Sequence, residues 1–244
     1  MISSYSKKAV VSGDIVEVYE YKKAILQGYD INEYHGCGRG FQATEEDKHI
    51  NRKKTLHRAR RDLRRLVNCN IAEYSKFVTL TFGEDVRDIR KANYEFKKFK
   101  QRLETKIDKK LQYVCVIEFM QNGRVHYHCV MFNLPYIKNK VLADIWGNGY
   151  VKINKIDSVD NVGAYVCKYM TKDGDDERLH GQKMYFSSRG LKKPLEIKKE
   201  EEVDNLAVAL PPSALTYETT FENEHNTIVY KQYNMKRRSK EINC

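Results

Sequence analysis

The amino-acid sequence predicts an α+β domain in which helices pack on a mainly antiparallel central sheet. Segments with strand and helix periodicity follow one another in the order β-α-β-β-α-β-α, which is typical of such a domain. An Asn122-Gly123 dipeptide joins the two central strand-like runs, and this is a strong hairpin signal. With 244 residues, 41% of them hydrophobic, and only four prolines, the chain can bury a sizeable core.

The strand-like segments are rich in β-branched and aromatic residues. FVTLTF is one such run, and YVCVIEF and VHYHCVMF flank the hairpin turn. The helical segments carry apolar residues at intervals of three and four, as Ile89, Phe96, Phe99 and Leu103 do. We therefore expect strands at 77–82, 113–119, 125–132 and 149–156, helices at 49–67, 85–106, 136–146 and 158–172, and a strand and turn at 183–191.

These elements predict one main domain at residues 49–195, between two small extensions. Residues 1–48 are β-prone and contain a glycine-rich stretch, but nothing in them indicates a role. After Pro194 the chain becomes highly charged, and residues 196–244 contain two alternating runs that predict a β-hairpin. The sequence contains no internal repeat.

The composition favours a polyanionic partner. Lysine and arginine number 44 against 33 acids, a formal net charge of +11, which favours nucleic acid first and an anionic membrane second. Because no apolar stretch could span a bilayer and the first residues lack a signal-peptide pattern, we expect a cytoplasmic protein without a membrane partner. The six cysteines form no C-x-x-C pair, which argues against a zinc ribbon and a disulfide framework.

A basic helical segment covers residues 51–65. Eight of these fifteen residues are lysine or arginine, and Asp62 is the only acid. A charge run is usually a solvated helix face, but a run of a single sign also suits contact with phosphates. The residues that we expect to contact DNA here are Arg58, Arg61, Arg64 and Arg65.

Two histidines lie one residue apart in the strand-like run RVHYHCVMF. Residues i and i+2 of a strand share a face, so His126 and His128 project together, away from Tyr127. Glu118 can lie beside them across the hairpin. Two exposed strand histidines would be the common explanation for H-x-H alone, but the added carboxylate favours a divalent-cation site.

The segment VGAYVCKYMTK predicts a helix with a tyrosine and lysine face. An amphipathic helix with solvated lysines would explain this pattern, with a neighbouring apolar arc of Val162, Val166 and Met170 against the sheet. A phenol is also a nucleophile when a cation stabilises the reacting phosphate, and two phenols one turn apart suit two successive transfers. The face, at positions i, i+3, i+4 and i+7, comprises Tyr165, Lys168, Tyr169 and Lys172.

FVTLTF, EFMQNGRVHYHCVMF and YVCKYMTK together resemble, in order and spacing, the three motifs of HUH-superfamily rolling-circle replication initiators. The third motif, Y-x-x-K-Y, is similar to that of two-tyrosine replication proteins from single-stranded DNA phages and bacterial plasmids. The stretches IWGNGYVKI and FSSRGLKKP are also similar to phage-type members. The resemblance covers residues 55 to 195 and, through the three motifs combined, is specific.

The resemblance implies a palm-like antiparallel sheet and a metal-dependent nicking and joining reaction on single-stranded origin DNA. It implies a 5′-phosphotyrosine intermediate and a free 3′-OH that primes a host DNA polymerase. Because no Walker A pattern is present, a separate host helicase would unwind the duplex. It assigns His126, His128 and Glu118 to Mg²⁺ or Mn²⁺, Tyr165 and Tyr169 to nucleophilic attack with Tyr165 first, Lys168 to charge stabilisation, and Lys172 to DNA contact.

Other protein classes share parts of this pattern. Relaxases usually use three histidines and an N-terminal tyrosine, whereas Tyr5 here lies in no recognisable motif. Single-tyrosine transposases of the HUH type share H-x-H but are shorter, and they differ in the DNA that they recognise. A non-catalytic basic DNA-binding protein with structural histidines is the third alternative.

Overall fold

The computed structural model describes residues 3–28, 44–156, 161–170, 178 and 182–240. The chain divides into two compact units. Residues 47–192 form one unit, and the two ends of the chain, residues 1–46 and 193–244, form the other. No helix within the described ranges is long and apolar enough to cross a membrane.

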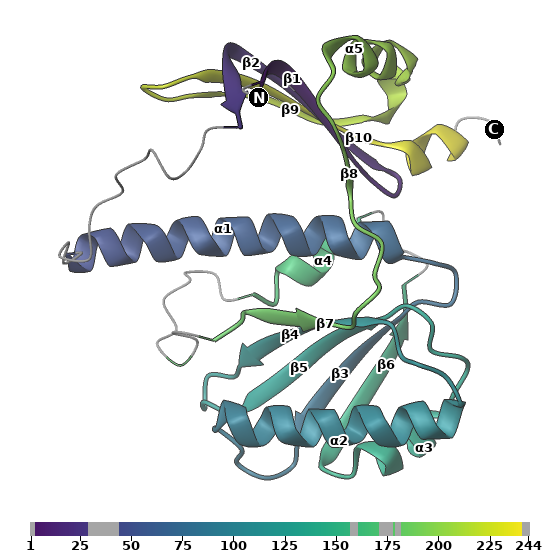
Figure 1. Ribbon diagram of the computed structural model, residues 1–244. Helices are drawn as coiled ribbons and strands as arrows, with labels where there is room; N and C mark the ends of the chain where they lie inside the picture. The colour runs from purple at the N-terminus through teal and green to yellow at the C-terminus, as the bar shows by residue number, and fades with distance from the viewer. Residues whose placement is uncertain (1–2, 29–43, 157–160, 171–177, 179–181, 241–244) are drawn as a thin grey trace. The chain divides into compact units, whose positions relative to one another are not determined.

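The unit at residues 47–192 is built on a five-stranded antiparallel sheet. The strand order is β6-β3-β5-β4-β7, so the two strands of the central hairpin, β4 and β5, lie side by side (Figure 1). The predicted α+β fold with an antiparallel sheet is confirmed. The strands are β3 (Lys76–Phe82), β4 (Tyr113–Phe119), β5 (Val125–Met131), β6 (Gly149–Lys155) and β7 (Tyr185–Ser187).

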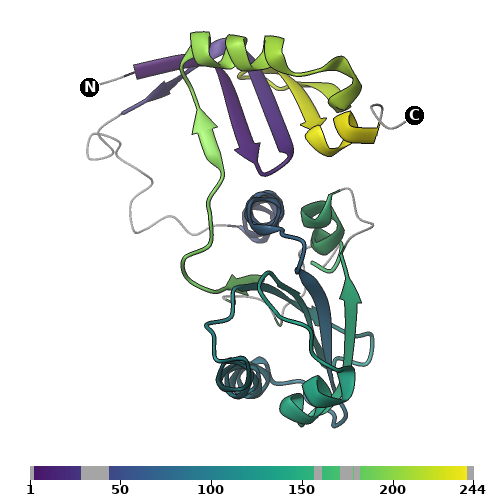
Figure 2. The ribbon, with the colours of Figure 1, turned by 90° about the vertical axis from the view of Figure 1, so that its right-hand side faces the viewer.

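Helices cover both faces of this sheet, as Figure 2 shows. Alternation along the strands sends Leu80 and Tyr127 to one apolar layer and Phe77 and Val130 to the other. The first layer packs under helices α2 and α3, and the second under helices α1 and α4. The helices are α1 (Glu45–Asn70), α2 (Ile89–Ile107), α3 (Asn139–Trp146) and α4 (Val162–Cys167).

The layer under α2 is an aromatic core. The Phe96 ring lies 5.1 Å from that of Tyr127, and the Phe99 ring lies 5.5 Å from that of Trp146, centroid to centroid. The Trp146 indole N–H donates to the Thr81 carbonyl at 3.1 Å, so its polar atom is satisfied inside the core. The apolar stripe predicted for this helix is buried in full: Ile89, Phe96, Phe99 and Leu103.

The tyrosine-bearing helix is shorter than the sequence predicts. Helix α4 ends at Cys167, and the chain then tightens into i→i+3 hydrogen bonds from Tyr169 N–H to the Val166 carbonyl and from Met170 N–H to the Cys167 carbonyl, each 3.1 Å long. Residues 157–160 and 171–172, which complete the predicted helix, lie outside the described residues. The predicted apolar arc of Val162, Val166 and Met170 is buried against the sheet.

The other unit joins both ends of the chain in a second five-stranded sheet, of order β8-β1-β2-β10-β9. Strand β2 near the start pairs with β10 near the end, a contact that the sequence does not predict. The charged segment after Pro194 includes helix α5, whose first turn carries three glutamates. The elements are β1 (Ser3–Ser12), β2 (Ile15–Gln27), β8 (Leu195–Ile197), α5 (Glu200–Ala209), η3 (Pro212–Ala214), β9 (Leu215–Glu222), β10 (Thr227–Asn234) and η4 (Met235–Lys240).

Candidate metal and tyrosine site

The β4–β5 hairpin brings the two histidines and the glutamate together. Gly123 in the turn has φ +85°, a conformation that favours glycine, and the Met120 N–H donates to the Arg124 carbonyl at 2.9 Å. In the register that follows, Glu118 lies directly opposite His126. His128 follows two residues later on the same face of β5.

These three side chains form a cluster that suits a divalent metal ion. Their ligand atoms all lie within 4.8 Å of one another, and His128 Nε2 is 2.5 Å from Glu118 Oε2. A six-coordinate ion with bonds of about 2.1 Å would hold its ligand atoms about 3 to 4 Å apart. His126 Nε2 is buried, and no described residue hydrogen-bonds to it. A buried ring nitrogen without a partner is costly, and a metal ion would satisfy it.

The electrostatics of the cluster favour the forms of these residues that bind metal. The hydrogen bond from His128 lowers the pKa of the Glu118 carboxyl, and the nearby histidine charges add to this effect. Burial, followed by the charge of His128, lowers the pKa of His126. A carboxylate and a neutral imidazole are the species that coordinate a cation.

Thr79 contacts the other ring nitrogen of His128. It lies opposite His128 on β3, with its Oγ1 3.4 Å from His128 Nδ1. A partner on the far nitrogen fixes the orientation of a ligating imidazole and the position of its proton. Thr79 therefore belongs to the support of this cluster.

The structure brings both predicted tyrosines to the histidine cluster. The Tyr169 ring stacks on the His128 imidazole, with centroids 3.8 Å apart and planes inclined by 19°. The hydroxyl of Tyr165 lies 3.0 Å from that of Tyr169. Both phenols therefore present their oxygens at one place beside the candidate metal ligands.

Lys168 lies against the first tyrosine rather than between the two hydroxyls. Its Nζ is 3.7 Å from the centroid of the Tyr165 ring and 5.4 Å from that of Tyr169. Burial, with the hydrogen bond to Tyr165 as the next cause, raises the pKa of the Tyr169 phenol. Lys172, predicted to extend this face, lies outside the described residues.

Helix α1 fixes the position of α4. The two helices approach so closely at Gly163 that a Cβ there would lie 2.3 Å from the Arg64 carbonyl oxygen. The side-chain oxygen of Asn68 accepts from Gly163 N–H at 2.9 Å, and its amide donates to Asn161 at 3.1 Å. Arg60 donates to the Met170 carbonyl at 3.1 Å, just after the tyrosines. Part of the basic segment thus holds the tyrosine helix in place.

The four arginines predicted to contact DNA differ in exposure. Arg58 and Arg61 are exposed, and Arg61 pairs with Asp62 at 2.9 Å. Arg64 is half-buried, and Arg65 is only 5% exposed. The structure therefore presents two of these side chains openly.

Arg124 is a candidate site residue that the sequence analysis missed. Positions 124, 126 and 128 alternate along the strand, so Arg124 shares the face of the two histidines. Besides burial, which is the largest cause, the positive charge of Arg124 lowers the pKa of His126, so the two groups are close. Its Nε is buried without a hydrogen-bond partner in the described part of the chain. The alternation R-x-H-x-H is the signal that could have identified it.

Comparisons with known proteins give two matches. Residues 75–174 match the model of a family of replication-associated proteins of the ORF2 type, and this range contains both histidines, Glu118 and both tyrosines. The chain is 27% identical over 145 residues to the Phasyl DNA replicon protein arp of Escherichia coli. That match covers 48% of this chain and 50% of the relative, so the chain spans about half the length of the curated relative it matches. No solved structure matches the chain.

Proposed function

We propose that this protein initiates replication of a phage or plasmid genome by nicking and joining single-stranded origin DNA through a tyrosine nucleophile. The observation that carries the proposal is the pair of phenol oxygens, 3.0 Å apart, on a tyrosine pair of which Tyr169 stacks on His128 of the Glu-His-His cluster. The similarity of residues 75–174 to replication-associated proteins supports the biological role. The +11 net charge suits a DNA substrate.

Glu118, His126 and His128 would hold the metal ion. A divalent ion bound there would polarise the scissile phosphate and neutralise charge that develops on its oxygens. Of the two ions that the sequence analysis implies, the donor set favours Mn²⁺, because Mg²⁺ prefers oxygen ligands and two of these three ligands are imidazoles.

Tyr165 would act first. Its Oη attacks the phosphorus, an Oη–P bond forms, and the P–O3′ bond breaks. The phenol loses its proton and the departing 3′ oxygen gains one, which leaves a 5′-phosphotyrosine and a free 3′-OH. Tyr165 suits this step better than Tyr169, because Lys168 lies over the Tyr165 ring, whereas burial raises the pKa of Tyr169.

Tyr169 would act second. Its hydroxyl lies where that of Tyr165 does, so it can attack the regenerated origin phosphate in the same site. The newly released 3′-OH then attacks the first phosphotyrosine, and the Tyr165 phenol leaves as the circle closes. Between the two steps a host polymerase would extend the first 3′-OH, and a host helicase would unwind the duplex.

Arg124 would bind a phosphate of the same strand. A guanidinium on the face of the histidines, with a buried Nε that lacks a partner in the described chain, is suited to a phosphodiester oxygen. It would position the strand across the metal cluster.

The test is a labelling experiment on single-stranded DNA. A random-sequence pool labelled at either end is incubated with the protein and Mn²⁺, and the products are separated in SDS. We expect only the 3′ label to travel with the protein, mass spectrometry to locate the DNA on Tyr165, and Tyr165→Phe to abolish this adduct.

Two metal-site variants complete this test. His126→Ala and His128→Ala should lose the adduct and bind Mn²⁺ more weakly in calorimetry. Adduct formation that survives both changes, or DNA attached first to Tyr169, would contradict the proposed roles. Tight DNA binding without any adduct would indicate a non-catalytic DNA-binding protein instead.

A further inference from the structure

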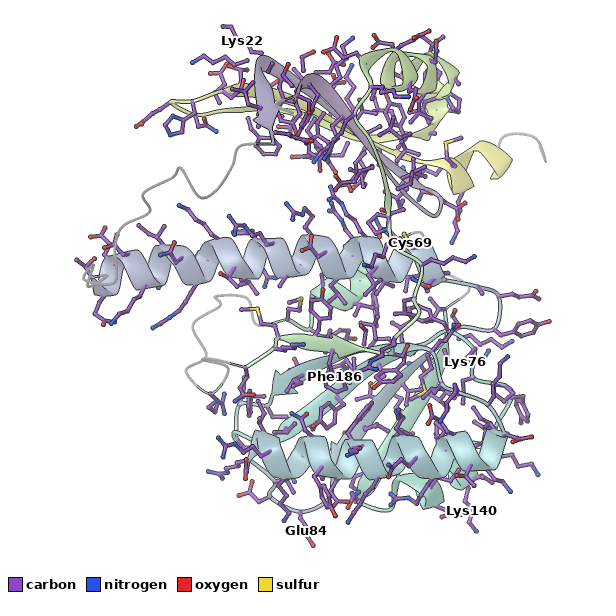
Figure 3. All side chains as sticks on the ribbon, viewed as in Figure 1. Lys22, Cys69, Lys76, Glu84, Lys140 and Phe186 are labelled. Carbon is purple, nitrogen blue, oxygen red and sulfur yellow. The ribbon has the colours of Figure 1, made fainter. Side chains whose placement is uncertain are left out.

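A second candidate DNA site lies at the other end of the sheet that carries the histidines. An open pocket of about 720 Å³ is lined by residues that follow α1, β5 and β7. Figure 3 labels Cys69 of its wall near Lys76, at one end of β3, and Glu84 beyond the opposite end of that strand. His126 pairs with Thr81, toward the Glu84 end, whereas the pocket begins at Phe132, beyond the Lys76 end. The pocket is therefore separate from the tyrosine site.

Two asparagines fix the walls of this pocket. Asn70 accepts from the Lys192 N–H and donates to the Lys192 carbonyl, both at 2.9 Å. Asn133 accepts from the Gln112 N–H at 2.8 Å and donates to the Lys110 carbonyl at 2.9 Å. Each amide thus ties its own segment to a second one with both of its polar ends. The pocket is preformed, which lowers the entropic cost of binding a ligand.

The rim of the pocket combines exposed aromatic rings with positive charge. Tyr74 is 67% exposed and Tyr136 is 87% exposed, which is unusual for such large apolar rings. Lys109 and Lys192 also line the pocket, are exposed, and pair with no acid within the described ranges. The floor is apolar and includes Phe132.

We propose that this pocket binds a nucleotide of the same single-stranded DNA, a proposal that rests on the proposed function. A base can stack on the tyrosines over the apolar floor, while the two lysines contact the flanking phosphates. Phe132 lies four to six residues along the strand from His128 and His126, which is about 14 to 20 Å at 3.4 Å per residue. At about 3.4 Å per nucleotide, the bound base would lie about four to six nucleotides from the scissile phosphate.

The test measures binding without cleavage, in EDTA, by fluorescence anisotropy of fluorescein-labelled dT20 on the full-length chain. We expect the double variant Tyr74→Ala, Tyr136→Ala to bind dT20 about tenfold or more weakly, because base stacking is lost. The corresponding Phe variants should bind as the unsubstituted chain does. Tyr94→Ala with Tyr217→Ala, which removes two exposed rings elsewhere, is the matched control and should change nothing.

A second pair of variants tests the charge. Lys109→Ala with Lys192→Ala should flatten the slope of log affinity against log salt by about 1.4, as expected for two contacts to a single strand. A 20-base-pair duplex, whose bases stay stacked, should lose no affinity in the tyrosine variant. If the tyrosine variant matches its control on dT20, or weakens duplex binding equally, the proposal is wrong.

The two proposals fail separately. Loss of affinity in the tyrosine variant would support the pocket even if the protein never forms an adduct. An adduct on Tyr165, with unchanged dT20 affinity in the tyrosine variant, would support the nuclease and overturn the pocket.

Discussion

His128 is the residue on which most contacts of the candidate site converge. Its Nε2 meets Glu118, its Nδ1 meets Thr79, and its ring face carries Tyr169. A change at this residue therefore affects a candidate metal ligand and a candidate nucleophile at once. His126 differs from it, because its Nε2 has no partner in the described chain and depends on a ligand for satisfaction.

Arg124→Ala tests the proposed phosphate contact. Loss of a hydrogen bond to a charged group costs about 1.5 to 3 kcal/mol, so we expect the rate of adduct formation to fall about 10- to 150-fold. Arg124→Lys should recover part of this rate, because it keeps the charge but not the planar fork of donors. The measurement is a time course of 3′-label transfer at saturating Mn²⁺.

Calorimetry with Mn²⁺ distinguishes this role from an indirect effect on His126. The affinity of Arg124→Ala for the ion should equal that of the unsubstituted protein or exceed it slightly, since a repelling charge is removed. A parallel fall in metal affinity and rate would show that Arg124 only supports the histidine.

At the scale of elements, the position of α4 depends on its close approach to α1. Gly163 allows this approach, and Asn68 bonds to the backbone at the same point. The sheet contributes the histidines and the helix contributes the tyrosines, so the separation of two packed elements decides whether the candidate nucleophiles reach the metal cluster.

Gly163→Ala should move α4 away from α1. Its new methyl group would lie 2.3 Å from a backbone oxygen, which must shift, so we expect a loss of about 1 to 3 kcal/mol in the free energy of unfolding and a slower transfer of DNA to Tyr165. Denaturant titration and the labelling assay measure the two effects. Gly83→Ala is the control, because its nearest neighbour would lie at an ordinary 3.7 Å. Equal behaviour of the two variants would refute this role for Gly163.

Local patterns predicted the elements well where the signal itself was local. The alternation in YVCVIEF and the Asn-Gly turn predicted β4 at its observed bounds and the hairpin that aligns Glu118 with His126. Helix α4 is shorter than predicted, because hydrogen bonds of the i→i+3 type end it at Cys167 although the periodicity continues. Arg124 was missed because a lone arginine beside a turn resembles ordinary surface charge until its buried Nε is seen.

At the scale of the whole molecule, the pairing of β2 with β10 was beyond sequence analysis. The two strands are about two hundred residues apart, and no periodicity in either one names the other as its partner. Their apolar cluster joins Val16 and Val18 to Val203 of α5, so the two ends of the chain share one core.

The division into units predicts that residues 44–192, produced alone, fold and keep the chemistry. This fragment contains the whole sheet with both of its apolar layers, the three candidate ligands and both tyrosines. We expect cooperative thermal unfolding by circular dichroism and an adduct on Tyr165 with single-stranded DNA and Mn²⁺. A folded fragment without the adduct would show that the chemistry needs the terminal unit, and an unfolded one would contradict the independence of the unit at residues 47–192.

The shared sheet of the chain ends also imposes an order on biosynthesis. On the ribosome, β1 and β2 emerge first but find β10 only after almost the entire chain has been made. The unit at residues 47–192, which is continuous in sequence, can fold while those early strands still wait with an unpaired edge. Completion of the terminal sheet therefore marks a finished polypeptide, and a chain released early would carry the candidate site with an exposed β edge prone to aggregation.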